Sequence, residues 1–130
     1  MTQQATSQKN LILIVDDDTD ILKIYKDYLT SEAYNVHAFS DAEAAYEHFC
    51  YTPKEFSLVL SDIRMPSMNG FKLTRKIKAI NSDAKVILMS SFPMSQSEVQ
   101  TVLPTLRVDG IIDKPIILKT LRACLKINLR

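Results

Sequence analysis

Cysteine is scarce in this sequence, and the little there is follows no functional spacing. The only two cysteines, Cys50 and Cys124, lie far apart and form neither a C-x-x-C pair nor a metal-ligand motif. A chain of this kind has no disulfide framework on which to depend. We interpret both residues as reduced thiols in the protein core, which indicates a cytoplasmic protein.

Long apolar runs and strongly basic stretches are also absent. The first ten residues, MTQQATSQKN, lack the apolar segment of a signal peptide, and no apolar run approaches the length that spans a bilayer. Lysine and arginine total 16 against 15 aspartates and glutamates, and no basic stripe is interleaved with aromatic residues. The sequence therefore argues against secretion, membrane insertion and direct nucleic-acid binding.

The composition that is present is that of one globular domain. The chain has 130 residues, of which 46% are hydrophobic and 24% charged. A domain of this size buries roughly two-thirds of its unfolded surface, so packing alone can stabilise it. We expect the domain to span residues 11–130 and the polar residues 1–10 to form a flexible tail.

Short apolar runs alternate with helical patterns along the chain. The predicted strands are residues 11–15, 35–39, 56–60, 86–89 and 111–112. The apolar faces of four predicted helices are Ile21, Ile24, Tyr25, Tyr28 and Leu29; Ala42, Ala45, Tyr46 and Phe49; Phe71, Leu73, Ile77 and Ile80; and Leu118, Leu121, Cys124 and Leu125. A fifth helix is expected at 95–103, between Pro93 and Pro104. Right-handed crossovers then give an α/β fold, a flavodoxin-like doubly wound (βα)5 sandwich with a five-stranded parallel sheet.

Two helix starts carry recognisable caps. Asp18 follows the first strand and is interpreted as a first-turn charge of the next helix. The segment 40–43, SDAE, has the pattern of a capping box, with Ser40 as the capping residue of the second helix.

Polar side chains stand at the carboxyl ends of the predicted strands. Asp16 and Asp17 follow the first strand, Asp62 the third, Ser90 the fourth and Lys114 the fifth. Such strand ends meet at one edge of a doubly wound sheet, where ligands bind. Carboxylates that crowd a crevice repel one another unless a cation is present, and oxygen ligands of this kind suit Mg²⁺. With Mg²⁺ and Lys114, the three carboxylates carry no net formal charge.

Three segments in this order resemble the signature segments of response-regulator receiver domains. They are 12–18 (ILIVDDD), 61–70 (SDIRMPSMNG) and 113–115 (DKP), and the resemblance covers about residues 10–126. It implies that Asp62 is the phosphoacceptor, Ser90 the hydroxyl switch and Lys114 the phosphoryl contact. It also implies that Asp16, Asp17, Asp62 and the backbone carbonyl of Arg64 bind Mg²⁺, and that the Lys114–Pro115 bond is cis.

The resemblance predicts a phosphorylation-activated switch of a two-component phosphorelay. A sensor histidine kinase or a histidine phosphotransfer protein would donate the phosphoryl group, and the domain would catalyse only its own phosphorylation and dephosphorylation. An unknown downstream protein would bind the face formed by the helix at 95–103, the fifth strand and the last helix. We expect no output domain in this chain, and either a monomer or a phosphorylation-dependent dimer.

Several residues depart from the receiver pattern or stand apart from it. Ile111 occupies the position where many receivers carry a tyrosine or phenylalanine that moves during switching, which puts this route of transmission in doubt. Arg64 and Phe92 flank the site and predict a slow loss of the phosphoryl group. His37 and His48 have no partner at ligand spacing and are interpreted as ordinary strand and helix residues.

Two other functions are compatible with parts of the pattern. A haloacid-dehalogenase-type phosphatase would use Asp16 as its nucleophile, but it needs a further acidic strand end after Lys114, for which the chain leaves no room. A degenerate receiver would serve only as a binding module, and its partner binding would be unaffected by Asp62→Asn. The presence of all the site residues argues against it.

Overall fold

The computed structural model describes residues 10–91 and 106–129 and has one parallel sheet of five strands in the order β2-β1-β3-β4-β5. The strands are β1 (Leu11–Val15), β2 (Asn35–Phe39), β3 (Phe56–Asp62), β4 (Val86–Ser90) and β5 (Gly110–Asp113). The helices are α2 (Thr19–Ser31), α3 (Ala42–Tyr51), α4 (Gly70–Ile80) and α6 (Leu118–Asn128). The predicted fold class is therefore confirmed, while the helix expected at 95–103 and nearly all of the expected tail lie outside the described residues.

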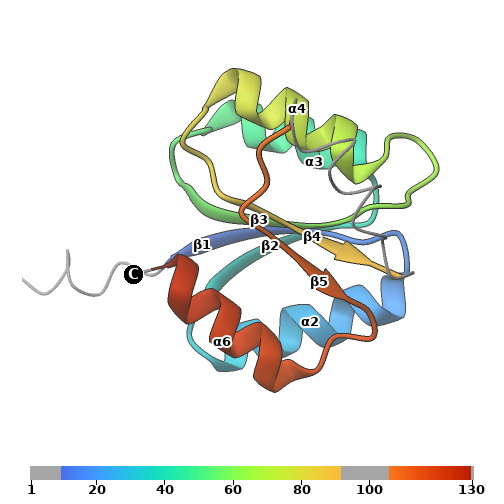
Figure 1. Cartoon of the computed structure of the whole chain (residues 1–130), viewed down its shortest axis with the longest axis vertical. Helices are drawn as coiled ribbons and strands as arrows, with labels where there is room; N and C mark the ends of the chain where they lie inside the picture. Colours follow the sequence, from blue (N-terminus) through green and yellow to red (C-terminus); the bar gives the residue numbers. More distant parts are fainter. Residues whose placement is uncertain (1–9, 92–105, 130) are drawn as a thin grey trace, which may run out of the picture.

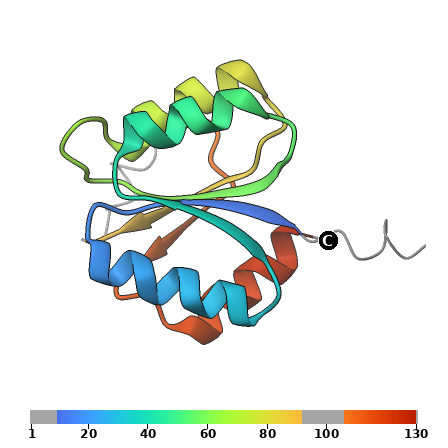
Figure 2. The same ribbon diagram turned by 180° about the vertical axis from the view of Figure 1, so that it is seen from behind.

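The helices cover both faces of the sheet. α3 and α4 lie on one face and α2 and α6 on the other (Figures 1 and 2). β1 supplies both layers of the core, because Leu13 and Val15 pack under α3 and α4 whereas Ile12 and Ile14 pack under α2 and α6. This two-sided burial is why β1, β3 and β4 read as continuous apolar runs in the sequence.

The strands extend further than their apolar residues. β3 continues through Ser61 to Asp62, β4 reaches Ser90, and β5 runs from Gly110 to Asp113. Ladder hydrogen bonds use the backbone, so polar side chains can occupy the last positions of a strand. Asp62 and Ser90 are thereby fixed within the sheet, whereas Asp16, Asp17 and Lys114 directly follow their strands.

The predicted inner faces of two helices need correction. Ile24 is 53% exposed and Ile80 is 47% exposed, although both were expected to face the core. In α2 the buried positions are Leu22, Tyr25 and Leu29, whose spacing of three and four residues follows one helical stripe. Ile24 lies off that stripe, and Ile80 is the last residue of its helix, where the core has ended.

The caps are also partly different from the prediction. Asp18, interpreted as a first-turn charge, is the N-cap of α2, and its carboxylate accepts hydrogen bonds from the backbone N–H groups of Asp20 and Ile21. The cap of α3 is Asp41 and not Ser40, because the Asp41 carboxylate accepts from the backbone N–H of Ala44. The capping-box interpretation was thus wrong by one residue.

The two cysteines are unpaired, but only one is even partly buried. Cys124 is half-buried on α6, whereas Cys50 is exposed on α3, which corrects the expectation that both are core thiols. None of the helices in the described part of the chain has the length and apolarity needed to cross a membrane.

Candidate functional site

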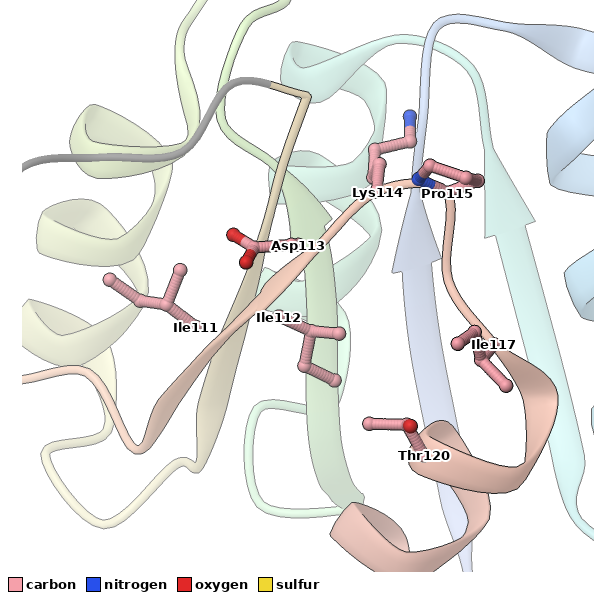
Figure 3. Close-up of a pocket in the computed structure, with 7 residues that line it drawn as sticks. All are labelled: Ile111, Ile112, Asp113, Lys114, Pro115, Ile117 and Thr120. Atoms are coloured by element: carbon pink, nitrogen blue, oxygen red, sulfur yellow. The ribbon is translucent and has the colours of Figure 1, made fainter.

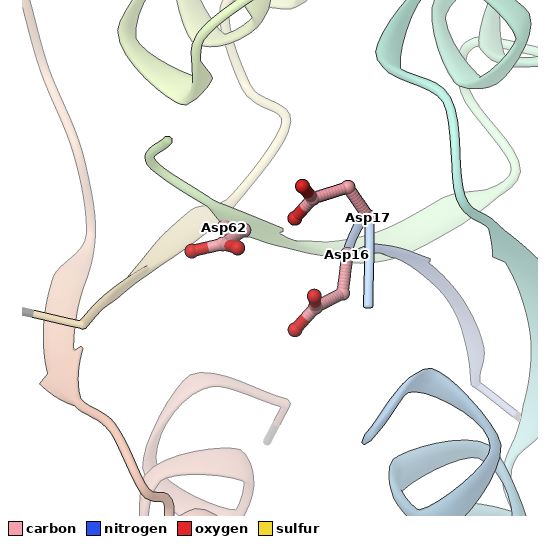
Figure 4. Close-up of side chains that lie close together, drawn as sticks. All are labelled: Asp16, Asp17 and Asp62. Atoms are coloured by element: carbon pink, nitrogen blue, oxygen red, sulfur yellow. The ribbon is translucent and has the colours of Figure 1, made fainter. Parts of the chain in front are cut away.

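Three carboxylates converge at the carboxyl edge of the sheet. Asp16 and Asp17 follow β1, and Asp62 ends the neighbouring strand β3 (Figure 4). Ligand oxygens from the three side chains all lie within 4.8 Å of one another. The sequence-based prediction that these residues meet is therefore confirmed, and the arrangement concentrates negative charge in a small volume.

Asp62 is almost fully buried and has an unsatisfied carboxylate oxygen. The residue is only 3% exposed, and its Oδ1 atom has no hydrogen-bond partner among the described residues. Burial raises the pKa of the Asp62 carboxyl to about 6; Lys114 opposes this rise, while Asp16 and Asp17 add to it. A buried carboxylate oxygen without a partner is costly, so this atom is suited to bind a cation or to react.

Lys114 supplies the positive charge at this edge. Its ammonium group lies 2.8 Å from Oδ2 of Asp16 and 3.4 Å from Oδ2 of Asp62. Burial by itself would lower the pKa of Lys114, but the hydrogen bond and the negative charge of Asp16 outweigh burial, so the pKa lies above its ordinary value. In this state Lys114 is therefore bound more closely to Asp16 than to the predicted phosphoacceptor.

The other predicted site residues lie around this core. Ser90 ends β4 and is buried, and its carbonyl oxygen accepts a hydrogen bond of 2.6 Å from the backbone N–H of Lys114. The adjacent Ser91 is exposed, so of the two serines only Ser90 is enclosed beside the sheet. Arg64 lies two residues after Asp62 with an exposed side chain, and Phe92 lies outside the described residues.

Gly70 packs directly against the backbone of Asp62. A Cβ atom at Gly70 would lie 2.4 Å from the carbonyl oxygen of Asp62 and 3.0 Å from Cα of Ile63. The backbone N–H of Gly70 also donates a 2.7 Å hydrogen bond to the Ile63 carbonyl. The start of α4 is thus held against the end of β3, an approach that only a residue without a side chain permits.

The loop between β3 and α4 is anchored on its other side by Asp41. The hydroxyl of Ser67 donates a 2.9 Å hydrogen bond to Oδ1 of Asp41, while Oδ2 of the same carboxylate caps α3. Sequence reasoning missed this link, because the two residues lie 26 positions apart and belong to different elements. It ties the loop that carries Arg64 to a neighbouring helix.

Tyr25 was interpreted only as a packing residue, and the structure gives it a polar contact as well. The side chain is buried on α2, and its hydroxyl oxygen accepts a hydrogen bond from the backbone N–H of Ile116. Burial is the main reason that the pKa of Tyr25 is raised. Ile116 lies two residues after Lys114, beyond the cis bond between Lys114 and Pro115, so this hydrogen bond holds the segment that carries Lys114 against α2.

A cavity of about 390 Å³ lies beside β5 and the start of α6. It is lined by Ile111, Ile112, Asp113, Lys114, Pro115, Ile117 and Thr120 (Figure 3). Ile111 and Ile112 point to opposite sides of β5, and Ile111 is half-buried against the core layer under α3 and α4. The position that departs from the receiver pattern is thus part of a surface next to Lys114.

The acidic cluster fits a hard divalent cation. It offers carboxylate oxygens only, one of which has no partner in the part of the chain that the structure describes, and it already attracts the ammonium group of Lys114. Mg²⁺ favours such oxygen ligands and retains several waters in its coordination shell. Asp16, Asp17 and Asp62 would hold it.

Comparison with known proteins places the chain in a family. Residues 12–126 match the response regulator receiver domain. A receiver domain protein (CheY-like) from Methanospirillum hungatei has the same fold, with a TM-score of 0.84 and 30% identity over 94% of both chains. The CheX-CheY-BeF3-Mg²⁺ complex from Borrelia burgdorferi contains a chain that matches with a TM-score of 0.81 and 26% identity, covering 93% of this chain and 90% of that one.

This chain belongs to the response regulator receiver domain family. It is a receiver domain of two-component response regulators, which is a signalling domain. Among curated proteins, the two-component response regulator ARR14 of Arabidopsis thaliana is 40% identical over 79 residues, which is 61% of this chain. The matched residues span about a fifth of ARR14, 21% of its length.

Proposed function

We propose that this receiver domain accepts a phosphoryl group on Asp62 and changes its partner binding in response. The observation that carries the proposal is the buried Oδ1 of Asp62, which has no hydrogen-bond partner within residues 10–91 and 106–129 and lies at a strand end beside two carboxylates and one lysine. A phosphoryl group on Asp62 adds strong acceptor oxygens at a point where Lys114 can pair with them.

The reaction uses a phosphohistidine of a sensor histidine kinase or of a histidine phosphotransfer protein. The ionised Asp62 carboxylate attacks the phosphorus in line, an O–P bond forms, the P–N bond breaks, and the departing imidazole takes up a proton. Asp16, Asp17, Asp62 and the backbone carbonyl of Arg64 would hold Mg²⁺, which neutralises charge on the phosphoryl oxygens. Lys114 pairs with one of those oxygens.

The switch consists of contacts that exist only with the phosphoryl group present. Lys114 then exchanges part of its contact with Asp16 for a phosphoryl oxygen, and the Ser90 hydroxyl donates a hydrogen bond to another. The hydrogen bond from the Lys114 N–H to the Ser90 carbonyl links the end of β4, where Ser90 lies, to the residue that follows β5. The change is expected to reach the surface of β5 and α6, where a downstream protein binds.

Asp16 is a poor candidate for a covalent phosphatase nucleophile. It is fully buried, and its two carboxylate oxygens are engaged by the backbone N–H of Asp18 and by Lys114. We therefore propose that the domain catalyses its own phosphorylation and dephosphorylation and has no separate substrate. The two unpaired cysteines favour action in the cytoplasm.

The test is phosphorylation by a small donor followed by intact mass measurement. Incubation with acetyl phosphate or phosphoramidate and Mg²⁺ should add about 80 Da to the chain, which is one phosphoryl group. Asp62→Asn should abolish the gain, and Asp113→Asn should retain it, because Asp113 is an exposed carboxylate at the end of β5. A gain that persists in Asp62→Asn would show that another residue is the acceptor.

A further inference from the structure

Two histidines meet beside β2, the outermost strand of the sheet, away from the acidic cluster. Nδ1 of His37 on β2 lies 2.7 Å from Nε2 of His48 on α3, a hydrogen bond between side chains that are 11 positions apart. The sequence analysis found no histidine partner for either residue, and the structure corrects that interpretation. β2 is an edge strand, and His37 is exposed while His48 is half-buried, so solvent reaches the pair.

Aromatic contacts fix the orientation of both rings. The ring centroid of His48 lies 4.9 Å from that of Phe39 and 5.7 Å from that of Phe56. The His37 ring packs edge-on against Phe56 at 5.9 Å, and the two imidazoles are 4.9 Å apart and tilted by 57°. The facing nitrogens are therefore positioned by packing and do not depend on free rotation of surface side chains.

The pair is held together by a single proton when both rings are neutral. One imidazole nitrogen donates and the other accepts. When the donating ring carries its proton on the other ring nitrogen instead, both rings stay neutral and two nitrogen lone pairs face the same small space. Burial, the neighbouring His48 and the charge of Lys26 on α2 lower the pKa of His37. The neutral imidazole that binds metals is therefore the form of His37 at neutral pH.

A divalent transition-metal ion can bind both nitrogens after a small separation of the two rings. Zn²⁺ binds imidazole nitrogen at about 2.0–2.1 Å, so in tetrahedral geometry two neighbouring ligand nitrogens lie about 3.3 Å apart. The observed nitrogen–nitrogen distance of 2.7 Å has to widen by about 0.6 Å. Nitrogen ligands select Zn²⁺, Cu²⁺ or Ni²⁺ over Mg²⁺, so this pair and the acidic cluster prefer different ions.

We propose that Nδ1 of His37 and Nε2 of His48 form a binding site for a divalent transition-metal ion. Water completes the coordination on the exposed side. The ion would join β2 to α3, and Phe39 connects this pair to the acidic cluster, because the Phe39 carbonyl accepts a hydrogen bond from the backbone N–H of Asp16.

The experiment titrates Zn²⁺ into the tag-free chain and follows the ring nitrogens by long-range ¹⁵N NMR. Cys50→Ser is used as the background in all samples, because Cys50 is an exposed thiol on the same helix. We expect one Zn²⁺ per chain, with shifts at Nδ1 of His37 and Nε2 of His48. Loss of an outer-shell partner weakens metal binding by roughly 10- to 100-fold. His37→Gln and His48→Gln each remove a direct ligand, so each should weaken Zn²⁺ binding by at least as much.

Two controls separate this site from the acidic cluster. Asp62→Asn should leave the Zn²⁺ affinity and the histidine shifts unchanged, and excess Mg²⁺ should not displace Zn²⁺ from the histidines. The backbone spectrum of each glutamine variant verifies its fold before titration. The proposal is overturned if neither ring responds up to about 1 mM Zn²⁺, if only one ring responds, or if the variant lacking both histidines binds with the original affinity.

Discussion

The two edges of the sheet, at the carboxyl and amino ends of the strands, differ in how their charged side chains are paired. At the carboxyl edge, Asp16, Asp17 and Asp62 crowd together, and Oδ1 of Asp62 has no partner in the described part of the chain. At the amino edge, Oδ2 of Asp109 accepts hydrogen bonds from the buried backbone N–H of Val86 at 2.7 Å and from Lys78 at 3.2 Å.

Lys78 completes the arrangement at the amino edge. Its ammonium group also donates a 2.6 Å hydrogen bond to the carbonyl of Ala84, just before β4. Lys78 and Asp109 together therefore provide hydrogen-bond partners for backbone groups at the start of β4. The amino edge therefore stabilises the fold, whereas the carboxyl edge holds charge that the fold alone does not neutralise. The difference supports the proposal that a cation and a phosphoryl group bind at the carboxyl edge.

The largest expected effect comes from removing the charge of Asp62. The folded-state pKa of about 6 lies above the ordinary value of 3.8, so stability from the neutral form is present below pH 4 and is lost as pH rises through 6. Asp62→Asn stays neutral and should raise the free energy of unfolding at pH 8, without Mg²⁺, by about 3 kcal/mol. Urea unfolding of both proteins at pH 8 and pH 4 measures this.

The same comparison has two internal checks. At pH 4 the two proteins should differ by less than about 1 kcal/mol, because Asp62 is then largely protonated. Adding Mg²⁺ at pH 8 should stabilise the original chain more than Asp62→Asn. Equal stabilities at both pH values would mean that the carboxyl edge is not under electrostatic strain.

The amino edge should respond to charge removal with the opposite sign. Asp109→Ala leaves the Val86 N–H without its acceptor and removes the ion pair of the partly buried Lys78, which should lower the free energy of unfolding by about 2 kcal/mol. Asp109→Asn retains an acceptor oxygen and removes only the charge, so it should cost less. Thermal unfolding of the three proteins at pH 7 ranks them, and an Asp109→Ala protein as stable as the original would abolish the contrast between the two edges.

The smallest expected effect concerns the two glycines, one at each edge. Gly70→Ala forces a Cβ against the Asp62 carbonyl and should cost about 1.5 kcal/mol, with slower phosphorylation because the acceptor shifts. At Gly110 a Cβ would meet only Ile87 side-chain atoms at 3.7 Å and beyond, which is ordinary contact. Gly110→Ala is thus the matched control and should change stability by at most about 0.5 kcal/mol.

Chemical denaturation measures the loss of stability in the two alanine variants, and the rate of mass gain with acetyl phosphate measures the slowing of phosphorylation. If both alanine variants behave alike, the close approach of α4 to β3 is not what positions Asp62.

Much of the fold and the centre of the site could be predicted from sequence because they follow from local patterns. Buried strands read as apolar runs, and parallel strands place Asp16, Asp17 and Asp62 at the same edge. The failures came from features that depend on packing across elements. The orientation of Ile24 needed the exact position of the helix on the sheet, and the contact between His37 and His48 needed the β2–α3 packing.

Some features had no sequence signal at all. The closer pairing of Lys114 with Asp16 than with Asp62 is a matter of tenths of an ångström in a charged cluster, which only coordinates give. Both Ser40 and Asp41 have side chains that can cap a helix. Which of them caps α3 depends on the backbone conformation at the start of the helix, which the sequence does not reveal.

The unequal contacts of Lys114 bear on the speed of the proposed response. The lysine is already at the site, 2.8 Å from one carboxylate and 3.4 Å from the other, so it has only to rotate its side chain to change partners. Side-chain rotations are orders of magnitude faster than collective rearrangements of loops and helices. In the proposed response we therefore expect capture of the phosphoryl group by Lys114 to be faster than any movement of the backbone around it.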